Sequence, residues 1–125
     1  MFVVGAGATK TEIVTNANTA ITLGSGLLPV YATPAMVALM EGAAVLAIAK
    51  DLNSGESSVG ISISVEHLQA TSLNKRVVAT ATLTAMDGRK LSFNVELHDD
   101  NGNLLGRGTH ERMIIDVEKF MSKLK

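Results

Sequence analysis

Hydrophobic residues follow two rhythms along the chain, the first helical and the second alternating. Residues 35–49 read AMVALMEGAAVLAIA, which is apolar on every side of a helix except at Glu41. Thr33 and Pro34 precede this stretch, and threonine at an N-cap with proline at the first helical position is typical of a helix start. We therefore predict a long helix that begins at Thr33 and ends at residues 50–52, ahead of an Asn-Ser-Gly-Glu turn.

Alternating apolar and polar residues after the helix predict β-strands. The predicted strands cover residues 58–66, 76–86, 89–98 and 104–115. A tight hairpin signal at Asp87-Gly88 joins the middle two strands, and an Asp-Asp-Asn-Gly turn precedes the last one. Residues 118–123 are expected to add a short terminal helix.

The segment before the long helix is less regular. Residues 11–15 are expected to form a first strand, and the residues from 16 to 32, rich in asparagine, glycine and proline, a long loop. The predicted order is one strand, one long helix and a meander of four antiparallel strands. Because an apolar sheet face needs a cover, we predict a single α+β domain over residues 1–125. In it, a curved five-stranded antiparallel sheet wraps around the central helix.

Composition narrows the possible functions. Hydrophobic residues make up 46% of the 125 residues and charged residues 18%, which suggests apolar surface hidden between subunits. A net charge of −1 gives no basic face for nucleic acid. The chain has no cysteine, which excludes disulfides, thiolate metal sites and cysteine nucleophiles. The N-terminus lacks the basic start of a signal peptide and Glu41 interrupts the longest apolar run, so we expect a cytoplasmic protein that does not span a membrane.

Glu41 is the strongest candidate for chemistry because it is the only polar side chain in residues 35–49. A carboxylate in apolar surroundings loses its hydration, so it needs partners or a chemical role. Thr33 stands at the helix entrance, and His67 ends the next apolar strand. Threonine, glutamate and histidine converging on an apolar pocket make a hydrolytic site, in which Glu41 either attacks a carbonyl or activates water.

The spacing of Thr33 and Glu41 limits how these residues meet. Eight residues of straight helix separate them by ~12 Å along the axis. A direct contact within one helix is therefore not expected, and either a substrate or a dimer interface has to bridge the gap. We favour a two-fold dimer with the pocket between the protomers.

Strand alternation assigns further candidates to the faces of the sheet. Counting alternate residues puts His67 on the helix-facing side with an apolar row, which is Val59, Ile61, Ile63 and Val65. Gly60 falls on the other side, where a missing side chain suits a bulge or lets a substrate approach the backbone. His110 and Arg112 share one side of the last strand, where solvated charges are the ordinary expectation.

Four stretches of the chain resemble the family of fluoroacetyl-CoA thioesterase and its relatives, which has the hot-dog fold. The stretches are VYATPAMVALMEGAA, SSVGISISVEHLQAT, DGRKLSFNVELHD and GRGTHERMIIDVEKF. The most specific features are the GTHER motif followed by an apolar strand, and the spacing of Thr33, Glu41 and His67.

The resemblance implies a role for each of five residues. The family's catalytic threonine, glutamate and histidine fall on Thr33, Glu41 and His67, the glycine beside the acyl thioester on Gly60, and the arginine that contacts coenzyme A on Arg112. It implies hydrolysis of a small acyl-CoA by a homodimer or higher oligomer, with no cofactor or metal beyond the coenzyme A part of the substrate.

One segment departs from the family, in which an aromatic-rich lid precedes the threonine. Here residues 21–31 read ITLGSGLLPVY, with one tyrosine and no phenylalanine, so the acyl group stays open. A hot-dog protein that binds acyl-CoA or coenzyme A with little turnover is the first alternative, which affinity without hydrolysis would identify. A hot-dog hydratase would need an Asp/His pair on a differently spaced motif, and the sequence lacks one.

Overall fold

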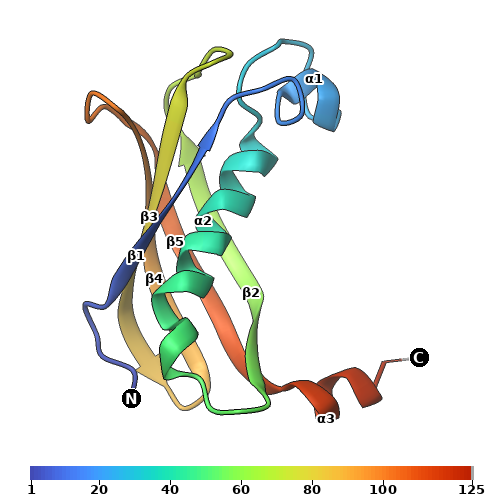
Figure 1. Cartoon of the computed structure of the whole chain (residues 1–125), viewed down its shortest axis with the longest axis vertical. Coiled ribbons are helices and arrows are strands. Elements are labelled where there is room, and N and C mark those ends of the chain that lie inside the picture. The colour runs from blue at the N-terminus through green and yellow to red at the C-terminus, as the bar shows by residue number, and fades with distance from the viewer. Residues whose placement is uncertain (125) are drawn as a thin grey trace.

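The computed structural model describes residues 1–124 (Figure 1). Its elements in chain order are β1 (Gly7–Ile13), α1 (Ala20–Leu23), α2 (Thr33–Ile48), a 3₁₀ turn η1 (Ala49–Asp51), β2 (Glu56–His67), β3 (Arg76–Asp87), β4 (Lys90–Asp99), β5 (Leu104–Asp116) and α3 (Val117–Ser122). The predicted long helix and the predicted strands are all present. Each predicted strand lies within one to four residues of its observed ends.

The strand order corrects the predicted meander of four. The sheet is antiparallel with the order β1-β3-β4-β5-β2, so β2 pairs with β5 at one edge rather than with β3. The segment between β2 and β3, residues 68–75, is longer than a tight hairpin allows and carries the chain across to the other side of the sheet. Among residues 1–124, the outer edges of β1 and β2 therefore have no neighbouring strand.

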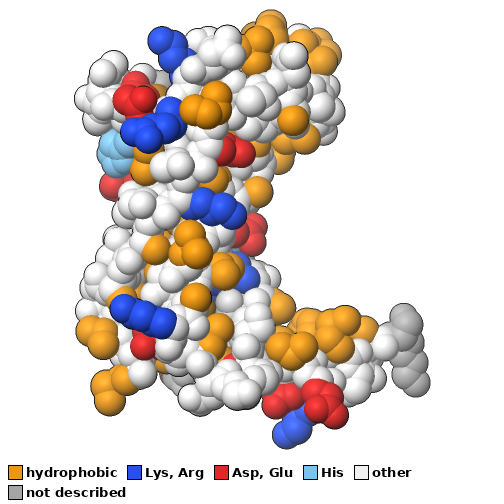
Figure 2. All heavy atoms as spheres, viewed as in Figure 1, with side chains coloured by type: hydrophobic (Ala, Val, Ile, Leu, Met, Phe, Trp, Pro, Cys, Tyr) orange, Lys and Arg blue, Asp and Glu red, His pale blue; other side chains and the backbone are white. Residues whose placement is uncertain are grey.

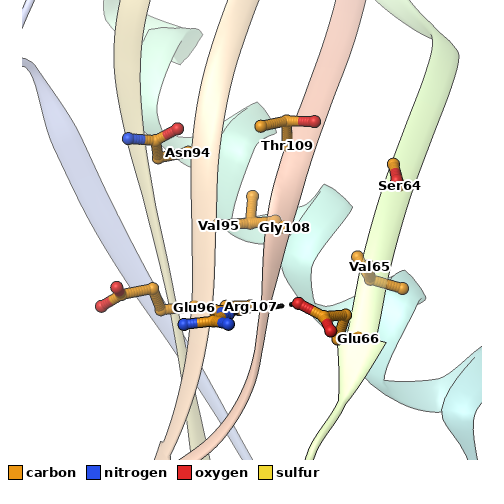
Figure 3. A pocket seen from close by; sticks show the side chains of 9 residues that line it. All are labelled: Ser64, Val65, Glu66, Asn94, Val95, Glu96, Arg107, Gly108 and Thr109. Atoms are coloured by element: carbon orange, nitrogen blue, oxygen red, sulfur yellow. Dashed lines mark hydrogen bonds and ion pairs between the residues drawn. The ribbon is translucent and has the colours of Figure 1, made fainter.

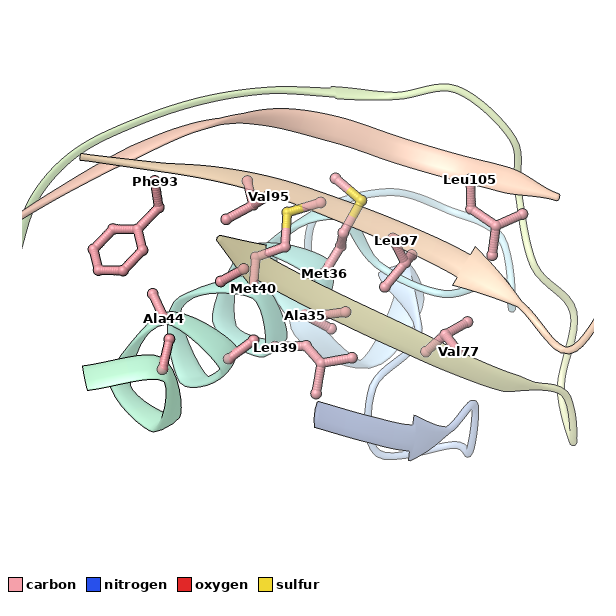
Figure 4. Packing of buried hydrophobic residues seen from close by; sticks show 14 of the residues in the cluster. Ala35, Met36, Leu39, Met40, Ala44, Val77, Phe93, Val95, Leu97 and Leu105 are labelled. Carbon is pink, nitrogen blue, oxygen red and sulfur yellow. The ribbon is translucent and has the colours of Figure 1, made fainter. Parts of the chain in front are cut away.

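The core lies between α2 and the concave face of the sheet (Figures 1 and 4). Buried side chains of α2 recur every three or four residues, as expected for one face of a helix. They meet every second residue of β3 and β4, among them Val77, Phe93, Val95 and Leu97. This packing fixes α2 along the hollow of the curved sheet, as predicted.

Not all of α2 is covered, although its sequence is apolar on every side except at Glu41. Ala38, Val45 and Leu46 are exposed on one side, and the side chain of Glu41 keeps 38% of its exposure. By length and composition alone, the helical stretch of residues 33–51 is apolar enough to cross a membrane, a test that core helices also pass. The uncovered side of α2 leaves apolar surface free beside β2.

The segment ahead of α2 is more structured than predicted. Strand β1 starts at Gly7 because it pairs with β3 from Gly7 opposite Thr82 to Ile13 opposite Arg76. The predicted loop contains the short helix α1, which Thr19 caps, and single bridges between Thr19 and Tyr31 and between Val30 and Ser72. The first bridge closes the loop on itself, and the second ties it to the connection between β2 and β3.

A β-bulge in β2 corrects the predicted faces of that strand. Gly60 pairs with Arg112 and Ser62 with Glu111, so Ile61 is an extra residue that shifts the alternation by one. Gly60 therefore faces the same concave side as Ile63, Val65 and His67, although unbroken alternation puts it on the opposite side. Val59, opposite Met113, lies on the outer side.

Candidate active site

Thr33 lies at the start of α2, but its hydroxyl is not used as a helix cap. The N-cap residue is Ala32, and Thr33 is the first residue of the helix with Pro34 behind it. The Thr33 Oγ1 instead lies 2.8 Å from Nδ1 of His67, at the end of β2. The predicted capping role is therefore wrong, because the hydroxyl makes a cross-element hydrogen bond with the histidine.

The ring of His67 packs against Tyr31 and also lines a small pocket. The edge of its ring meets the ring of Tyr31, with centroids 6.5 Å apart and planes at 83°. Its buried Nε2 has no hydrogen-bond partner within residues 1–124, and the His67 side chain lines a pocket together with Thr33, Ala20 and Ala70. Burial lowers the pKa of His67 below its ordinary value, so the ring is neutral at pH 7. The pair can pass a proton between Thr33 and a group in the pocket.

Tyr31 anchors this corner of the molecule. It is buried, and its hydroxyl donates a hydrogen bond to Glu12 on β1. Burial, followed by the hydrogen bond and the negative charge of Glu12, raises the pKa of Tyr31, so it stays a donor. A tyrosine directly ahead of Ala32 and Thr33 fixes the helix start against β1.

Glu41 lies two turns further along α2 and faces Gly60 rather than Thr33. A methyl group at Gly60 would lie 3.0 Å from Glu41 Oε2 and 3.3 Å from Nη1 of Arg112. Glu41 Oε2 and Arg112 Nη1 are 3.5 Å apart, and a second small pocket opens beside Glu41, Gly60 and His110. Glycine at position 60 therefore leaves the space through which a ligand can reach the carboxylate.

Arg112 is almost completely buried, with 6% of its surface exposed. Its Nε donates to Ser58 Oγ at 2.8 Å, one Nη to the Ser58 carbonyl at 3.1 Å, and the other to Glu41 and to His110 Nε2 at 3.1 Å. Four of its five N–H groups are thus engaged. In this arrangement Arg112 is the partner of Glu41, and the implied contact with coenzyme A stays a prediction for its remaining N–H group.

His110 is the site residue that the sequence did not reveal. Its Nδ1 lies 2.8 Å from the Ser62 carbonyl, which can only accept, so Nδ1 carries the proton and Nε2 accepts from Arg112. The ring stacks on Phe93 at 6.0 Å. Burial lowers the pKa of His110, and the charge of Arg112 adds to this effect, so the ring stays neutral. Its position two residues before Arg112 on one strand face was the available signal.

The predicted catalytic residues thus form two clusters rather than one. Thr33 and His67 meet at one end of β2, and Glu41 lies with Gly60 and Arg112 toward the other. Seven residues of β2 separate Gly60 from His67, about 20 Å of strand. Within residues 1–124, no group of three or more His, Asp or Glu side chains is arranged to hold a metal ion.

A shallow depression also lies on the outer side of the sheet, away from α2 (Figure 3). Ser64, Asn94 and Thr109 line it, and Arg107 pairs with Glu66 across it at 3.3 Å. These are exposed side chains on three adjacent strands. The depression is separated from both clusters by the sheet itself, which makes its residues suitable as controls.

Comparison with known proteins identifies the family. A profile of the fluoroacetyl-CoA-specific thioesterase family matches residues 14–118. The fluoroacetyl-CoA thioesterase of Streptantibioticus cattleyicolor is 46% identical over 96 residues, covering 77% of this chain and 68% of the relative. The chain belongs to this family and is a thioester hydrolase.

Solved structures agree on the fold. A solved structure of a fluoroacetyl-CoA thioesterase superposes with a TM-score of 0.92 at 38% identity, covering 99% of this chain and 96% of that chain. A thioesterase superfamily member from Thermus thermophilus is 29% identical with a TM-score of 0.90, covering 97% and 89%. The predicted hot-dog fold is confirmed.

Proposed function

We propose that the chain hydrolyses a small acyl-CoA thioester in a site completed between two copies. One copy supplies Glu41, held by Arg112, and the other supplies Thr33 and His67. One observation carries the proposal: these residues form two clusters, one beside each end of β2. The outer edge of β2 has no neighbouring strand among residues 1–124. A single copy has both halves of a hydrolytic site but cannot join them.

Antiparallel pairing of two β2 strands across a two-fold axis would join the halves. With the axis at Ser64, Ile63 pairs with Val65 of the other copy and Ser62 with Glu66. Because Ile61 is the extra residue of the bulge and is left out of the register, Gly60 of one copy lies opposite His67 of the other. The bulge makes the faces agree, because it turns Gly60 to the concave side that His67 also faces. Glu41, which contacts the Gly60 position, then approaches the pocket of the second copy.

The chemistry follows from the hydrogen bonds of each half. Water attacks the thioester carbonyl as Glu41 or the neutral His67 takes its proton, and a tetrahedral oxyanion forms. Thr33 and the free N–H groups of the first turn of α2 stabilise that negative charge. Collapse breaks the carbon–sulfur bond, and the coenzyme A thiolate leaves and takes up the proton. A Glu41 acyl anhydride is the rival route, which oxygen-18 from water entering Glu41 in a single turnover would identify.

Family membership and the pocket support a small acyl group. A solved relative, 39% identical, is described in complex with fluoroacetate and CoA. For this chain we propose a short acyl-CoA, held where Gly60 leaves room beside the carboxylate. The loop from residue 21 to 31 lacks phenylalanine, so fluoroacetyl selectivity is not part of the proposal.

Two experiments test the activity and the shared site separately. Thiol release from a panel of acyl-CoA esters should be lost in Glu41→Gln, by about 1000-fold, and retained in Glu66→Gln, whose carboxylate lies on the outer side of the sheet. No turnover with any ester, together with measurable coenzyme A affinity, would overturn the hydrolytic activity.

Mixing two inactive variants tests whether the site is shared. Glu41→Gln and His67→Ala copies, allowed to exchange, would form hybrids in which one of the two sites is intact. Activity should then recover to about a quarter of the wild-type value. A mixture of Glu41→Gln with Glu41→Ala should recover nothing. Equal failure in both mixtures, with exchange shown by mass spectrometry, would place the whole site within one copy.

A further inference from the structure

Helix α3 stands away from the rest of the chain (Figures 1 and 2). Asp116 caps it through the Lys119 N–H at 3.0 Å, and the Val117 N–H donates to the Gly55 carbonyl at 2.9 Å, so its direction is fixed at its root. Its side chains divide between two faces. Phe120 turns toward Ile114, Ile115 and Arg89 of its own chain.

The outer face of α3 is apolar and uncovered. Val117 and Met121 are four residues apart on one face of α3, and Leu124 follows just beyond the end of the helix; each is exposed, Met121 by 57%. Figure 2 shows hydrophobic side chains on the side of α3 that faces the hollow of the molecule and charged side chains on the opposite side. An ordered helix that presents its apolar face to water needs a partner surface.

A second apolar patch lies at the opposite end of the hollow. The loop of residues 20–31 exposes Ile21, Leu23, Leu27 and Leu28, with Leu27 92% exposed, and Figure 2 shows hydrophobic side chains over α1. The chain from Ile13 to Met40 contains no charged residue. This loop also supplies Ala20, Ser25 and Tyr31 to the wall of the pocket that Thr33 and His67 share.

The outer edge of β2 runs between these two patches (Figure 1). A two-fold axis through the middle of that edge exchanges the two ends of the molecule, so α3 of one copy meets the loop of residues 20–31 of the other. The connection is consistent along the chain, because α3 leaves β5 at Asp116, which pairs with Glu56 at the start of β2. In the pairing centred on Ser64, Glu56 stands level with the second copy's residues just beyond His67.

We propose that α3 of each copy packs on the loop of residues 20–31 of the other copy and forms one wall of its Thr33–His67 pocket. The proposal rests on the shared site proposed above and adds a surface that sets the size of the acyl group. Val117 and Met121 then contact apolar loop side chains on one side and the acyl chain on the other. The symmetric arrangement buries both apolar patches at once.

Cross-linking tests this contact without any reference to activity, because the chain has no cysteine of its own. A Leu27→Cys, Met121→Cys double variant treated with a short bismaleimide should give covalent dimers, and each single variant should not. Glu96→Cys with Met121→Cys is the matched control, since Glu96 is exposed and lines the depression on the outer side of the sheet, which the sheet separates from the Thr33–His67 pocket. Ser64→Cys reports the pairing of the two strands by itself.

The outcomes separate the two proposals. Cross-linking through Ser64→Cys without cross-linking through Leu27→Cys and Met121→Cys would overturn the α3 contact and leave the shared site standing. Failure of both would overturn the strand pairing on which both proposals depend. If α3 forms a wall of the pocket, it should also affect the choice of substrate. Met121→Ala should favour a longer acyl-CoA over acetyl-CoA by about tenfold in kcat/KM. The control Lys119→Ala, on another face of α3, should not change that ratio.

Discussion

The two ends of β2 differ in how completely their polar groups are paired. Around Arg112, the carboxylate of Glu41, the ring of His110 and both oxygens of Ser58 are joined in one partly buried hydrogen-bond network. At the other end, Thr33 and His67 make one bond to each other, and Nε2 of His67 has no partner within residues 1–124.

This difference indicates that the Arg112 network positions Glu41, whereas the Thr33–His67 pair is free to bind a ligand. The Arg112 network is complete before any substrate arrives, so it fixes the position of Glu41 and supplies a permanent counter-charge to the carboxylate. The Thr33–His67 pair leaves a polar atom unpaired at a cost in stability, which is reasonable where a ligand or water will pair with it. Changes at the first cluster should therefore affect stability and turnover, and changes at the second turnover alone.

Replacing Arg112 should have the largest effect of these changes. Arg112→Met removes the donor that faces Glu41, and it leaves His110 Nε2 and Ser58 Oγ buried without partners. We expect turnover to fall about 100- to 1000-fold and the free energy of unfolding in urea to fall by about 2–3 kcal/mol. Arg107→Met, which breaks an exposed ion pair with Glu66, should cost less than about 0.5 kcal/mol. Normal turnover in a destabilised Arg112→Met protein would make the network purely structural.

A substitution of Thr33 tests the Thr33–His67 pair in the same way. Thr33→Val keeps the shape of the side chain and removes the hydrogen bond to His67, so kcat should fall about 100-fold. The free energy of unfolding should change by less than about 1 kcal/mol because the hydroxyl does not cap the helix. Thr33→Ser keeps the hydroxyl and should retain most of the activity. A loss of stability as large as that of Arg112→Met would remove the contrast between the clusters.

The local elements were predictable from the sequence, because each depends on nearby residues. Helix α2 follows from its apolar run and its Thr-Pro start, and the hairpin of β3 and β4 from Asp87-Gly88. Thr33, Glu41 and His67 were selected as candidate site residues through spacing that a family shares, and their catalytic roles stay a prediction. The hydrogen bond between Thr33 and His67 is the tertiary outcome of that spacing.

What the sequence did not reveal depends on contacts between distant residues. Gly60 suggests a bulge, but the pattern SVGISISV alternates without a break, so it does not show that Ile61 is the extra residue and that the two parts of the strand differ in phase. The placing of β2 beside β5 is a choice of strand partner, which local alternation does not determine. GTHER reads as a run of solvated charge, yet His110 and Arg112 are buried because α2 and β2 bring Glu41, Ser58 and the Ser62 carbonyl to them.

Replacing Gly60 gives a smaller and more local test of the cluster around Arg112. In Gly60→Ala, the added methyl would lie 3.0 Å from Glu41 Oε2 and 3.2 Å from His110 Cε1, so these groups have to shift by a few tenths of an ångström. We expect kcat/KM to fall about tenfold because the carboxylate is displaced from its position. Thiol release with saturating and limiting acyl-CoA gives kcat and KM separately. Ala70→Gly, a change of one methyl group beside the other cluster, is the matched control and should have a smaller effect.

The smallest expected effect is the response of stability to pH, and it concerns both clusters together. Burial lowers the pKa values of His67 and His110 below the ordinary 6.5, so the unfolded chain binds protons more readily than the folded one. Their contribution to stability is therefore complete above pH 6.5 and is lost as the pH falls through the lowered values. From pH 7 to pH 5 we expect a decrease of about 1 kcal/mol or less from these rings, since partial exposure weakens the effect at His67. Urea unfolding across that range should show this slope, and His67→Gln should remove only part of it because the ring of His110 is the more buried. A slope that vanishes completely in His67→Gln would mean that His110 binds protons equally in the folded and unfolded states, against the lowered pKa of its buried ring.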